Sequence, residues 1–310
     1  MLQPRPSSFS DSARGSSDQY VFPFDVHGFN LTVDPGTVCG DMSALREFFV
    51  NLKKGTEHLN YGREILRDWG AEHALKLASR DQPISVYDLG CGHGTDIVNI
   101  RQHASIQTTA AFRWQLAGIE NFSEYQKECK SLGIATHAVD LERDTYPGKN
   151  ASVDILIANQ VLEHTKEIFW IFSEAVRLVR PGGKFLVGVP NLASLHNRLL
   201  LLFGEQPTAQ QSLSAHVRGF TKPDFKKFAE TGGFFKLTEF RGSNFYPFPP
   251  GIARPLARMF PTLAWGAFFN LERTDRRGDF LECLSGDENF LETPFYGSPH
   301  NPARARKSRK

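Results

Sequence analysis

The spacing of apolar and polar residues divides the middle of the chain into alternating strands and helices. Short apolar runs typical of buried parallel strands lie at residues 84–89, 114–120, 134–141, 152–160 and 184–190. Segments with helical spacing separate several of them, at residues 96–102, 123–132 and 167–179. Strands that alternate with helices need right-handed crossovers, so this order predicts an α/β fold with a doubly wound, mostly parallel, Rossmann-like sheet. Ligands bind such sheets at the carboxyl ends of the strands.

After residue 190 two insertions interrupt the alternation of strands and helices. Residues 191–220 contain a helical segment and a polar loop, and residues 244–262 are rich in proline and aromatic residues. A helix begins at Thr221 with spacing like that of a capping box. Strands at 234–241 and 264–273 bring the sheet to seven. The insertions follow strands five and six, so we expect them either to cover an acceptor site as a cap or to pack against a dimer partner.

The ends of the chain differ from its middle. Residues 1–18 are rich in Ser, Pro and Arg and are predicted to be disordered. Residues 19–80 hold an extended arm and two helices, at 44–54 and 61–78, which form either a lid over the ligand or a layer on the sheet edge. We therefore divide the chain into 1–18, the N-terminal region 19–80, a binding domain 81–274, and a C-terminal extension 275–310.

The charge of the chain is concentrated at its C-terminus. The formal net charge is +2, but residues 301–310 hold five basic groups and no acid. The rest of the chain has 31 basic and 34 acidic groups, a charge of −3, which argues against a nucleic-acid partner. The basic tail is interpreted as a solvated terminus, with contact to an anionic membrane or RNA as the alternative.

The cysteines and the apolar runs indicate the cellular setting. The four cysteines are far apart and form no C-x-x-C pair, so we expect no disulfide framework and no metal site. No signal-peptide core and no apolar run long enough to span a bilayer are visible. These features predict a cytoplasmic location with at most peripheral membrane contact.

The most informative stretch is a glycine-rich turn after the first strand. Gly90, Gly92 and Gly94 alternate there, Asp88 precedes them, and Thr95 is predicted to cap the next helix. The spacing fits neither the dinucleotide fingerprint G-x-G-x-x-G nor the phosphate-binding loop. A carboxylate here would repel a pyrophosphate and attract an ammonium or sulfonium group.

Together with the downstream segments, this turn resembles motif I of the class I S-adenosylmethionine (SAM) dependent methyltransferases, in particular the type 11 group, over residues 60–274. The resemblance implies SAM as cofactor. It also implies that Asp88 holds the ammonium end of SAM, that Glu120 accepts from both ribose hydroxyls, and that Asp140 and Leu141 contact the adenine. The remaining cofactor-binding positions that it implies are Gly90, Cys91, Gly92, Gly94, Asn159 and Gln160.

Candidates for catalysis and acceptor binding follow the fourth strand and lie in the insertions. His164 is the first candidate for a general base, with Glu163 beside it, and His216 is the second. A structural role at a helix start is the alternative for His164. Five residues could line an acceptor pocket or serve only packing and solvation: Asn191, Asn197, Arg198, Arg218 and Tyr246.

These observations lead to one main hypothesis and two alternatives. We expect a methyltransferase that acts on an oxygen of a small metabolite, glycan or lipid-linked intermediate, by in-line transfer from the sulfonium. No [DNS]-P-P-[FYW] motif follows the fourth strand, which disfavours amino methylation of nucleic acid. The alternatives are a SAM-binding partner protein without turnover and a nicotinamide-dependent oxidoreductase, and Thr95 at the third fingerprint position argues against the latter. The oligomeric state stays open.

Overall fold

The computed structural model of the chain describes residues 62–108, 112–285 and 294–296. All described residues belong to one compact unit within Pro35–Lys310. The predicted disordered segment at 1–18, the arm, the helix at 44–54 and the basic tail lie outside the described residues.

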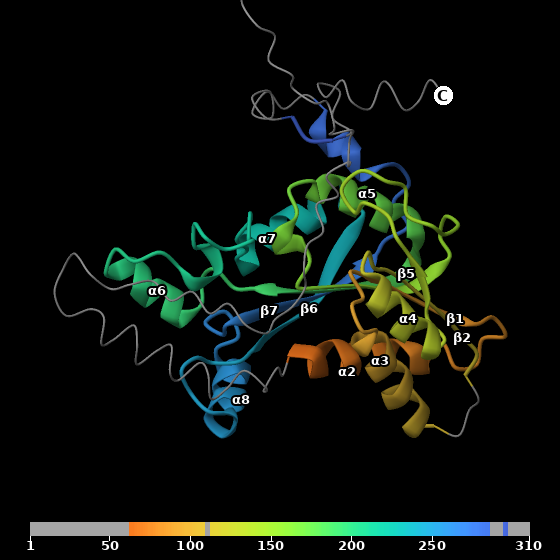
Figure 1. Cartoon of the computed structure of the whole chain (residues 1–310), viewed down its shortest axis with the longest axis horizontal. Helices are drawn as coiled ribbons and strands as arrows, with labels where there is room; N and C mark the ends of the chain where they lie inside the picture. The colour runs from red at the N-terminus through yellow and green to blue at the C-terminus, as the bar shows by residue number, and fades with distance from the viewer. Residues whose placement is uncertain (1–61, 109–111, 286–293, 297–310) are drawn as a thin grey trace, which may run out of the picture. The chain divides into compact units, whose positions relative to one another are not determined.

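A seven-stranded sheet in the order β3-β2-β1-β4-β5-β7-β6 forms the centre of the fold (Figure 1). Its five N-terminal strands are parallel, and β7 pairs antiparallel with both β5 and β6. The strands are β1 (Ile84–Leu89), β2 (Trp114–Ile119), β3 (Ala135–His137), β4 (Val153–Asn159), β5 (Val179–Pro190), β6 (Phe235–Ser243) and β7 (Gly266–Arg273). The predicted mostly parallel, seven-stranded α/β sheet is confirmed.

Helices cover both faces of this sheet (Figure 1). They are α2 (Gly62–Lys76), α3 (Thr95–Ile106), α4 (Ser123–Ser131), α5 (Ile168–Leu178), α6 (Leu195–Leu202), α7 (Lys222–Glu230) and α8 (Pro250–Met259), with the short 3₁₀ segments η1 (Leu162–His164), η2 (Thr208–Gln210), η3 (Thr231–Gly233) and η4 (Phe280–Leu284). In Figure 1, α5 and α7 lie above the sheet, whereas α2 and α3 lie below it.

The two faces have separate apolar cores because side chains alternate along each strand. Val86 of β1 packs in one core with residues of α2 and α3, including Ile97. Its neighbour Tyr87 packs in the other core, which contains Phe172 of α5. By this alternation Asp88 lies on the same face as Val86, the face covered by α2 and α3.

The strand order reverses between β1 and β4, which are neighbours in the sheet although β2 and β3 separate them in the sequence. Such a reversal opens a crevice at the carboxyl ends of the two strands, where ligands of doubly wound sheets bind. The glycine-rich turn follows β1, and Asn159 ends β4. The sheet thus brings the two motifs predicted from sequence to one crevice.

Several predicted boundaries are wrong in detail. The third strand ends at His137 and not at residue 141, so Asp140 lies in the loop that follows it. The fifth strand begins at Val179 and not at residue 184. Thr95 does not cap α3: Gly94 occupies the N-cap position in the left-handed conformation, without a side-chain hydrogen bond. Thr221 precedes α7 as expected, but its side chain makes no capping hydrogen bond.

The two insertions carry short helices of their own. Residues 191–220 form α6 and η2, and residues 244–262 form α8. Residue Asn191 at the end of β5 forms a bridge with Phe220, so the first insertion starts and finishes at the same place on the sheet. Within the described residues, no helix combines the length and the apolar character that a bilayer crossing requires.

Candidate active site

The turn after β1 is built from three glycines in the left-handed region, where L side chains are strained. Gly90, Gly92 and Gly94 have φ angles of 68°, 51° and 73°. A methyl group on Gly94 would lie 2.5 Å from the Ile134 side chain, so this glycine permits close packing behind the turn. A methyl group on Gly92 would have no atom within 4 Å. Gly92 therefore faces open space, as expected where backbone approaches a ligand.

Asp88 is one of three buried acids beside this turn. Asp88, Asp96 and Glu120 are 3%, 6% and 4% exposed. Burial, and then the nearby Asp96 carboxylate, raise the pKa of Asp88 well above its ordinary value, while the cation of Arg63 opposes this shift. Arg63 of α2 pairs with Asp96 at 3.0 Å. Buried carboxylates that lie close together repel one another and attract a further cation, such as an ammonium group.

Glu120, which follows β2, contacts the glycine-rich turn directly. Its Oε2 atom accepts a hydrogen bond of 2.8 Å from the Gly92 backbone N–H, and its Oε1 atom accepts one of 2.8 Å from Phe122. A carboxylate offers about four lone-pair sites, so further donors can bind there. The two hydroxyls of a ribose are donors of this kind.

Asn159 joins the end of β4 to the same group of acids. Its Nδ2 atom donates to Asp96 Oδ2 at 2.9 Å. The next residue, Gln160, has a φ angle of 57°, and its backbone N–H donates to the Gly188 carbonyl. Sequence reasoning did not single out Asp96. The sequence feature that could have identified Asp96 is an acid in the first turn of the helix after the glycines.

Asp140 and Leu141, predicted to contact adenine, lie beyond the end of β3. The Asp140 side chain is exposed, and its Oδ1 atom accepts from the Glu142 backbone N–H at 2.8 Å, which closes a local turn. The Leu141 carbonyl accepts from the Tyr146 hydroxyl at 2.6 Å. Adenine contact by these two residues stays a prediction.

Cys91 lies inside the turn and is buried against Cys129 of α4, with 3.8 Å between the two sulfur atoms. Burial raises the pKa of the Cys91 thiol, followed by the effect of the neighbouring Asp88 carboxylate. A thiol that resists ionisation is a poor nucleophile. Cys91 therefore contributes packing and its backbone to the turn.

The three catalytic candidates come together just after β4. Glu163 and His164 belong to η1, and His216 comes from the first insertion, with its ring centroid 4.7 Å from that of His164. Glu163 is 1% exposed, and burial raises its pKa to about 8. Burial lowers the pKa of His164, with His216 as the next cause. At neutral pH the His164 ring is therefore uncharged and able to accept a proton.

The proposed acceptor-pocket residues divide into two groups. The amides of Asn191 and Asn197 are buried and hydrogen-bonded within the protein, Asn191 to the carbonyls of Thr262 and Ala264 and Asn197 to Thr208 and the Asn191 carbonyl. They hold the two insertions together.

The other three residues are more accessible. Arg198 donates to the Ala193 carbonyl, and Arg218 donates to the Lys166 carbonyl. The Tyr246 ring packs beside His196, at 5.2 Å between centroids. Contact of these three side chains with an acceptor stays a prediction.

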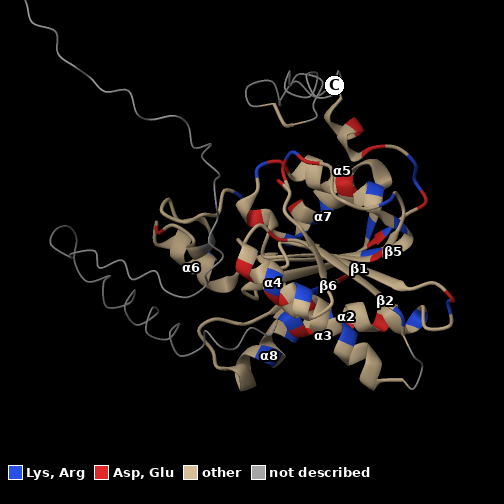
Figure 2. Ribbon diagram, turned by 45° about the vertical axis from the view of Figure 1, so that its right-hand side comes forward, with Lys and Arg blue, Asp and Glu red and all other residues tan. Residues whose placement is uncertain are grey.

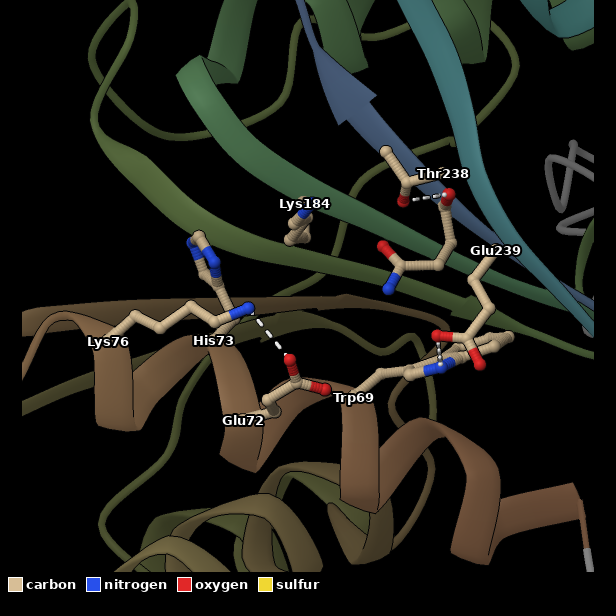
Figure 3. Close-up of a pocket in the computed structure, with 8 residues that line it drawn as sticks. Trp69, Glu72, His73, Lys76, Lys184, Thr238 and Glu239 are labelled. Carbon is tan, nitrogen blue, oxygen red and sulfur yellow. Dashed lines mark hydrogen bonds and ion pairs between the residues drawn. The ribbon is translucent and has the colours of Figure 1, made fainter.

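A separate polar cavity of about 160 Å³ lies between α2 and the last strands (Figure 3). Its lining includes His73, Lys184 and Asn270. Lys184 pairs with Ile155 near the start of β4, so this cavity is distant from the carboxyl ends of the parallel strands. It is also smaller than the several hundred Å³ that organic ligands usually occupy. It is therefore not the cofactor site.

Comparison with known proteins identifies the family of the chain. Residues 60–239, more than half of the chain, match the family described as "Methyltransferase domain". A protein of Mycolicibacterium smegmatis described as a probable S-adenosylmethionine-dependent methyltransferase is 33% identical over 89 residues, which are 28% of this chain and 31% of that protein. An uncharacterized 37.1 kDa protein in a transposon of Streptomyces fradiae is 30% identical over 114 residues, 36% of this chain and 31% of that protein. The matched segments thus cover about a third of these relatives' own length.

Solved structures of similar proteins include two SAM-dependent methyltransferases. The protein from Archaeoglobus fulgidus is 12% identical, with a TM-score of 0.43 over 68% of this chain and 94% of that chain. The protein from Mesorhizobium loti is 17% identical, with a TM-score of 0.42 over 67% of this chain and all of that chain. The family match argues against the nicotinamide-dependent alternative. The chain therefore belongs to the class I SAM-dependent methyltransferases.

Proposed function

We propose that this protein methylates an oxygen atom of a small metabolite, a sugar or a lipid-linked intermediate. The observation that carries the proposal is the position of two groups at the carboxyl edge of one sheet. The buried acids Asp88 and Glu120 flank the glycine-rich turn, and the Glu163–His164–His216 cluster follows the neighbouring strand β4. The first group is suited to a cationic cofactor and the second to the proton of an acceptor.

The residues of the crevice fit SAM by charge and hydrogen bonding. When bound, SAM supplies an electrophilic methyl group on its sulfonium. We assign Asp88 to its ammonium group and Glu120 to its ribose hydroxyls. The open space at Gly92 supports a close approach of the backbone. Asn159 fixes Asp96 beside these groups and keeps the acids in place.

The Glu163–His164–His216 cluster is assigned to the acceptor. A hydroxyl must lose its proton as it is methylated, and a neutral imidazole accepts a proton well near pH 7. With its lowered pKa His164 is uncharged at neutral pH and can accept the proton, whereas Glu163 with a pKa of about 8 is protonated. Alignment of the two reactants supplies the rest of the rate enhancement.

The insertions support an apolar or amphipathic acceptor. Of eleven large apolar side chains that are exposed among the described residues, ten belong to the two insertions. Leu202 and Phe203 at the end of α6 are 75% and 61% exposed, and α6 is drawn mostly without charge in Figure 2. Over α3 and α4, by contrast, basic and acidic residues lie side by side (Figure 2). We propose that residues 191–220 and 244–262 cover the acceptor and contact its apolar part.

Comparison of cells with and without the gene tests this function. Metabolites and glycolipids are extracted from both and analysed by mass spectrometry. We expect at least one compound to be lighter by the mass of one CH₂ group when the gene is absent. Identical metabolite and glycolipid profiles in the two kinds of cells would contradict the proposed acceptor classes.

A further inference from the structure

Three side chains of metal-binding type meet where η1 contacts the loop before α7. Glu163 offers a carboxylate oxygen, and His164 and His216 each offer an imidazole nitrogen, with the three ligand atoms within 4.8 Å of one another. The two segments are joined by the backbone, since Val217 N–H and Arg218 N–H both donate to the Glu163 carbonyl, at 2.9 and 3.2 Å. These backbone hydrogen bonds therefore hold the segment of Glu163 and His164 against the segment of His216.

The Glu163 carboxylate lacks the partners that a buried acid requires. It is 1% exposed, and neither of its oxygen atoms has a hydrogen-bond partner among the described residues. A buried carboxylate without a hydrogen bond or a cation is costly. A bound cation would supply the missing partner.

A hydrogen bond to the backbone sets the tautomer of the His164 ring. His164 Nδ1 lies 3.3 Å from the Ala215 carbonyl, and because a carbonyl only accepts, this bond places the ring proton on Nδ1. The lone pair of His164 is then on Nε2. Metal-binding histidines are commonly fixed in this way, with one ring nitrogen on a carbonyl and the other on the metal. The His216 ring packs edge-on against His164.

We propose that Glu163, His164 and His216 bind one divalent transition-metal ion, with zinc as the best match. Two imidazoles and one carboxylate, with a fourth position open, are a usual zinc ligand set. Bonds of about 2.0–2.2 Å place ligand atoms about 3.4 Å apart, so the present group needs only a modest contraction. The proposal replaces the expectation of no metal site, which rested on cysteine spacing alone.

The role of the metal rests on the proposed function. A hydroxyl of the acceptor that occupies the open position would lose its proton more readily, because the cation lowers its pKa. With the ion bound, His164 would serve as a ligand and not as the base, and the proton of the hydroxyl would pass to solvent water. Binding itself needs neither SAM nor acceptor, so it is measured independently of methyl transfer.

Titration calorimetry with zinc chloride tests the site. The full chain is first stripped with a chelator, and wild type is compared with His164→Gln, His216→Gln and Glu163→Gln. His103→Gln on α3 is the matched control, since this residue is partly exposed, lies beside Asp68 of α2 and is not a member of the cluster. Glu163→Gln keeps the size and shape of the buried side chain and introduces no charge, so we expect it to retain the fold. Circular dichroism checks the folding of every variant.

We expect one zinc ion per chain, at least about tenfold weaker binding in each of the three cluster variants, and unchanged binding in the control. Co²⁺ should give the visible absorption of a tetrahedral site in wild type only. The proposal is overturned if wild type binds no zinc, or if the folded cluster variants bind it as tightly as wild type. Failure of methyl transfer with intact zinc binding would instead count against the proposed function.

Discussion

The Glu120 carboxylate accepts a 2.8 Å hydrogen bond from the backbone N–H of Gly92, 28 residues earlier in the chain. This bond ties the end of β2 to the turn after β1 and places an acid where the cofactor's ribose is expected. We predict that Glu120→Ala weakens SAM binding at least tenfold, about 1.4 kcal/mol or more. Calorimetry with SAM measures it, and Glu124→Ala on the exposed face of α4 is the control. Unchanged affinity in Glu120→Ala would remove the ribose assignment.

Asp88→Asn should separate stability from cofactor binding. Burial and the Asp96 carboxylate raise the pKa of Asp88, so its charged form is disfavoured in the folded protein without ligand. Replacing it by the neutral amide removes this penalty, and we expect a melting temperature at pH 8 equal to or above that of wild type. SAM affinity should fall at least tenfold, because the ammonium group loses its counter-ion. Thermal denaturation and calorimetry measure the two effects, and wild-type affinity in the variant would count against the assignment.

The buried parallel strands and the glycine-rich turn could be predicted from sequence because each depends on local pattern. Short apolar runs specify buried strands, and alternating glycines mark positions with positive φ. The role of Asp96 could not be predicted in this way, since its partners Arg63 and Asn159 meet it only through tertiary packing.

The arrangement of the insertions likewise depends on tertiary packing. His216 lies 52 residues after His164, and only the folded loop brings the two rings together. Asn191 and Asn197 are polar residues in a predicted acceptor region, yet both are buried and hold loops by hydrogen bonds. A sequence pattern does not distinguish a polar side chain that faces a pocket from one that satisfies buried backbone groups.

His73 should make the fold sensitive to acid. Burial, followed by the cation of Lys184, lowers its pKa from 6.5 to about 4 in the folded chain. Between pH 6.5 and 4 the unfolded chain therefore binds the proton first, and stability falls as the pH falls. When the pH falls from 6.5 to 4.5, the unfolding free energy of wild type should decrease more than that of His73→Gln. We expect the two decreases to differ by about 2 kcal/mol. Urea unfolding at both pH values measures this difference. Equal losses in the two proteins would show that His73 is not protonated on unfolding.

Asp154 anchors the start of the sheet. Its carboxylate is fully buried and accepts two bonds of 2.7 Å from Arg80 and one of 2.8 Å from the Ser85 backbone. Asp154→Ala leaves these donors without their acceptor, and we expect a loss of about 3 kcal/mol in unfolding free energy. Asp81→Ala, which removes an exposed carboxylate paired with Arg113, should have no measurable effect. A stable Asp154→Ala protein in urea unfolding would contradict the account.

Leu202→Glu tests whether the insertions contact an apolar acceptor. The side chain is exposed, so we expect no change in melting temperature or SAM affinity. Transfer of labelled methyl groups into a lipid extract should fall several-fold. Ile106→Glu, at an exposed apolar residue of α3 outside the insertions, is the matched control. Equal methyl transfer by both variants would contradict the proposal that the insertions bind the acceptor.

The most direct test of the account is transfer of the methyl group itself. Purified protein is incubated with methyl-labelled SAM and an extract of the native host, and the products are separated from SAM and counted. We expect label in an extractable product with wild type and not with Asp88→Asn. If wild type binds SAM in calorimetry but no label leaves it, the chain is a SAM-binding partner protein and the proposed function is wrong.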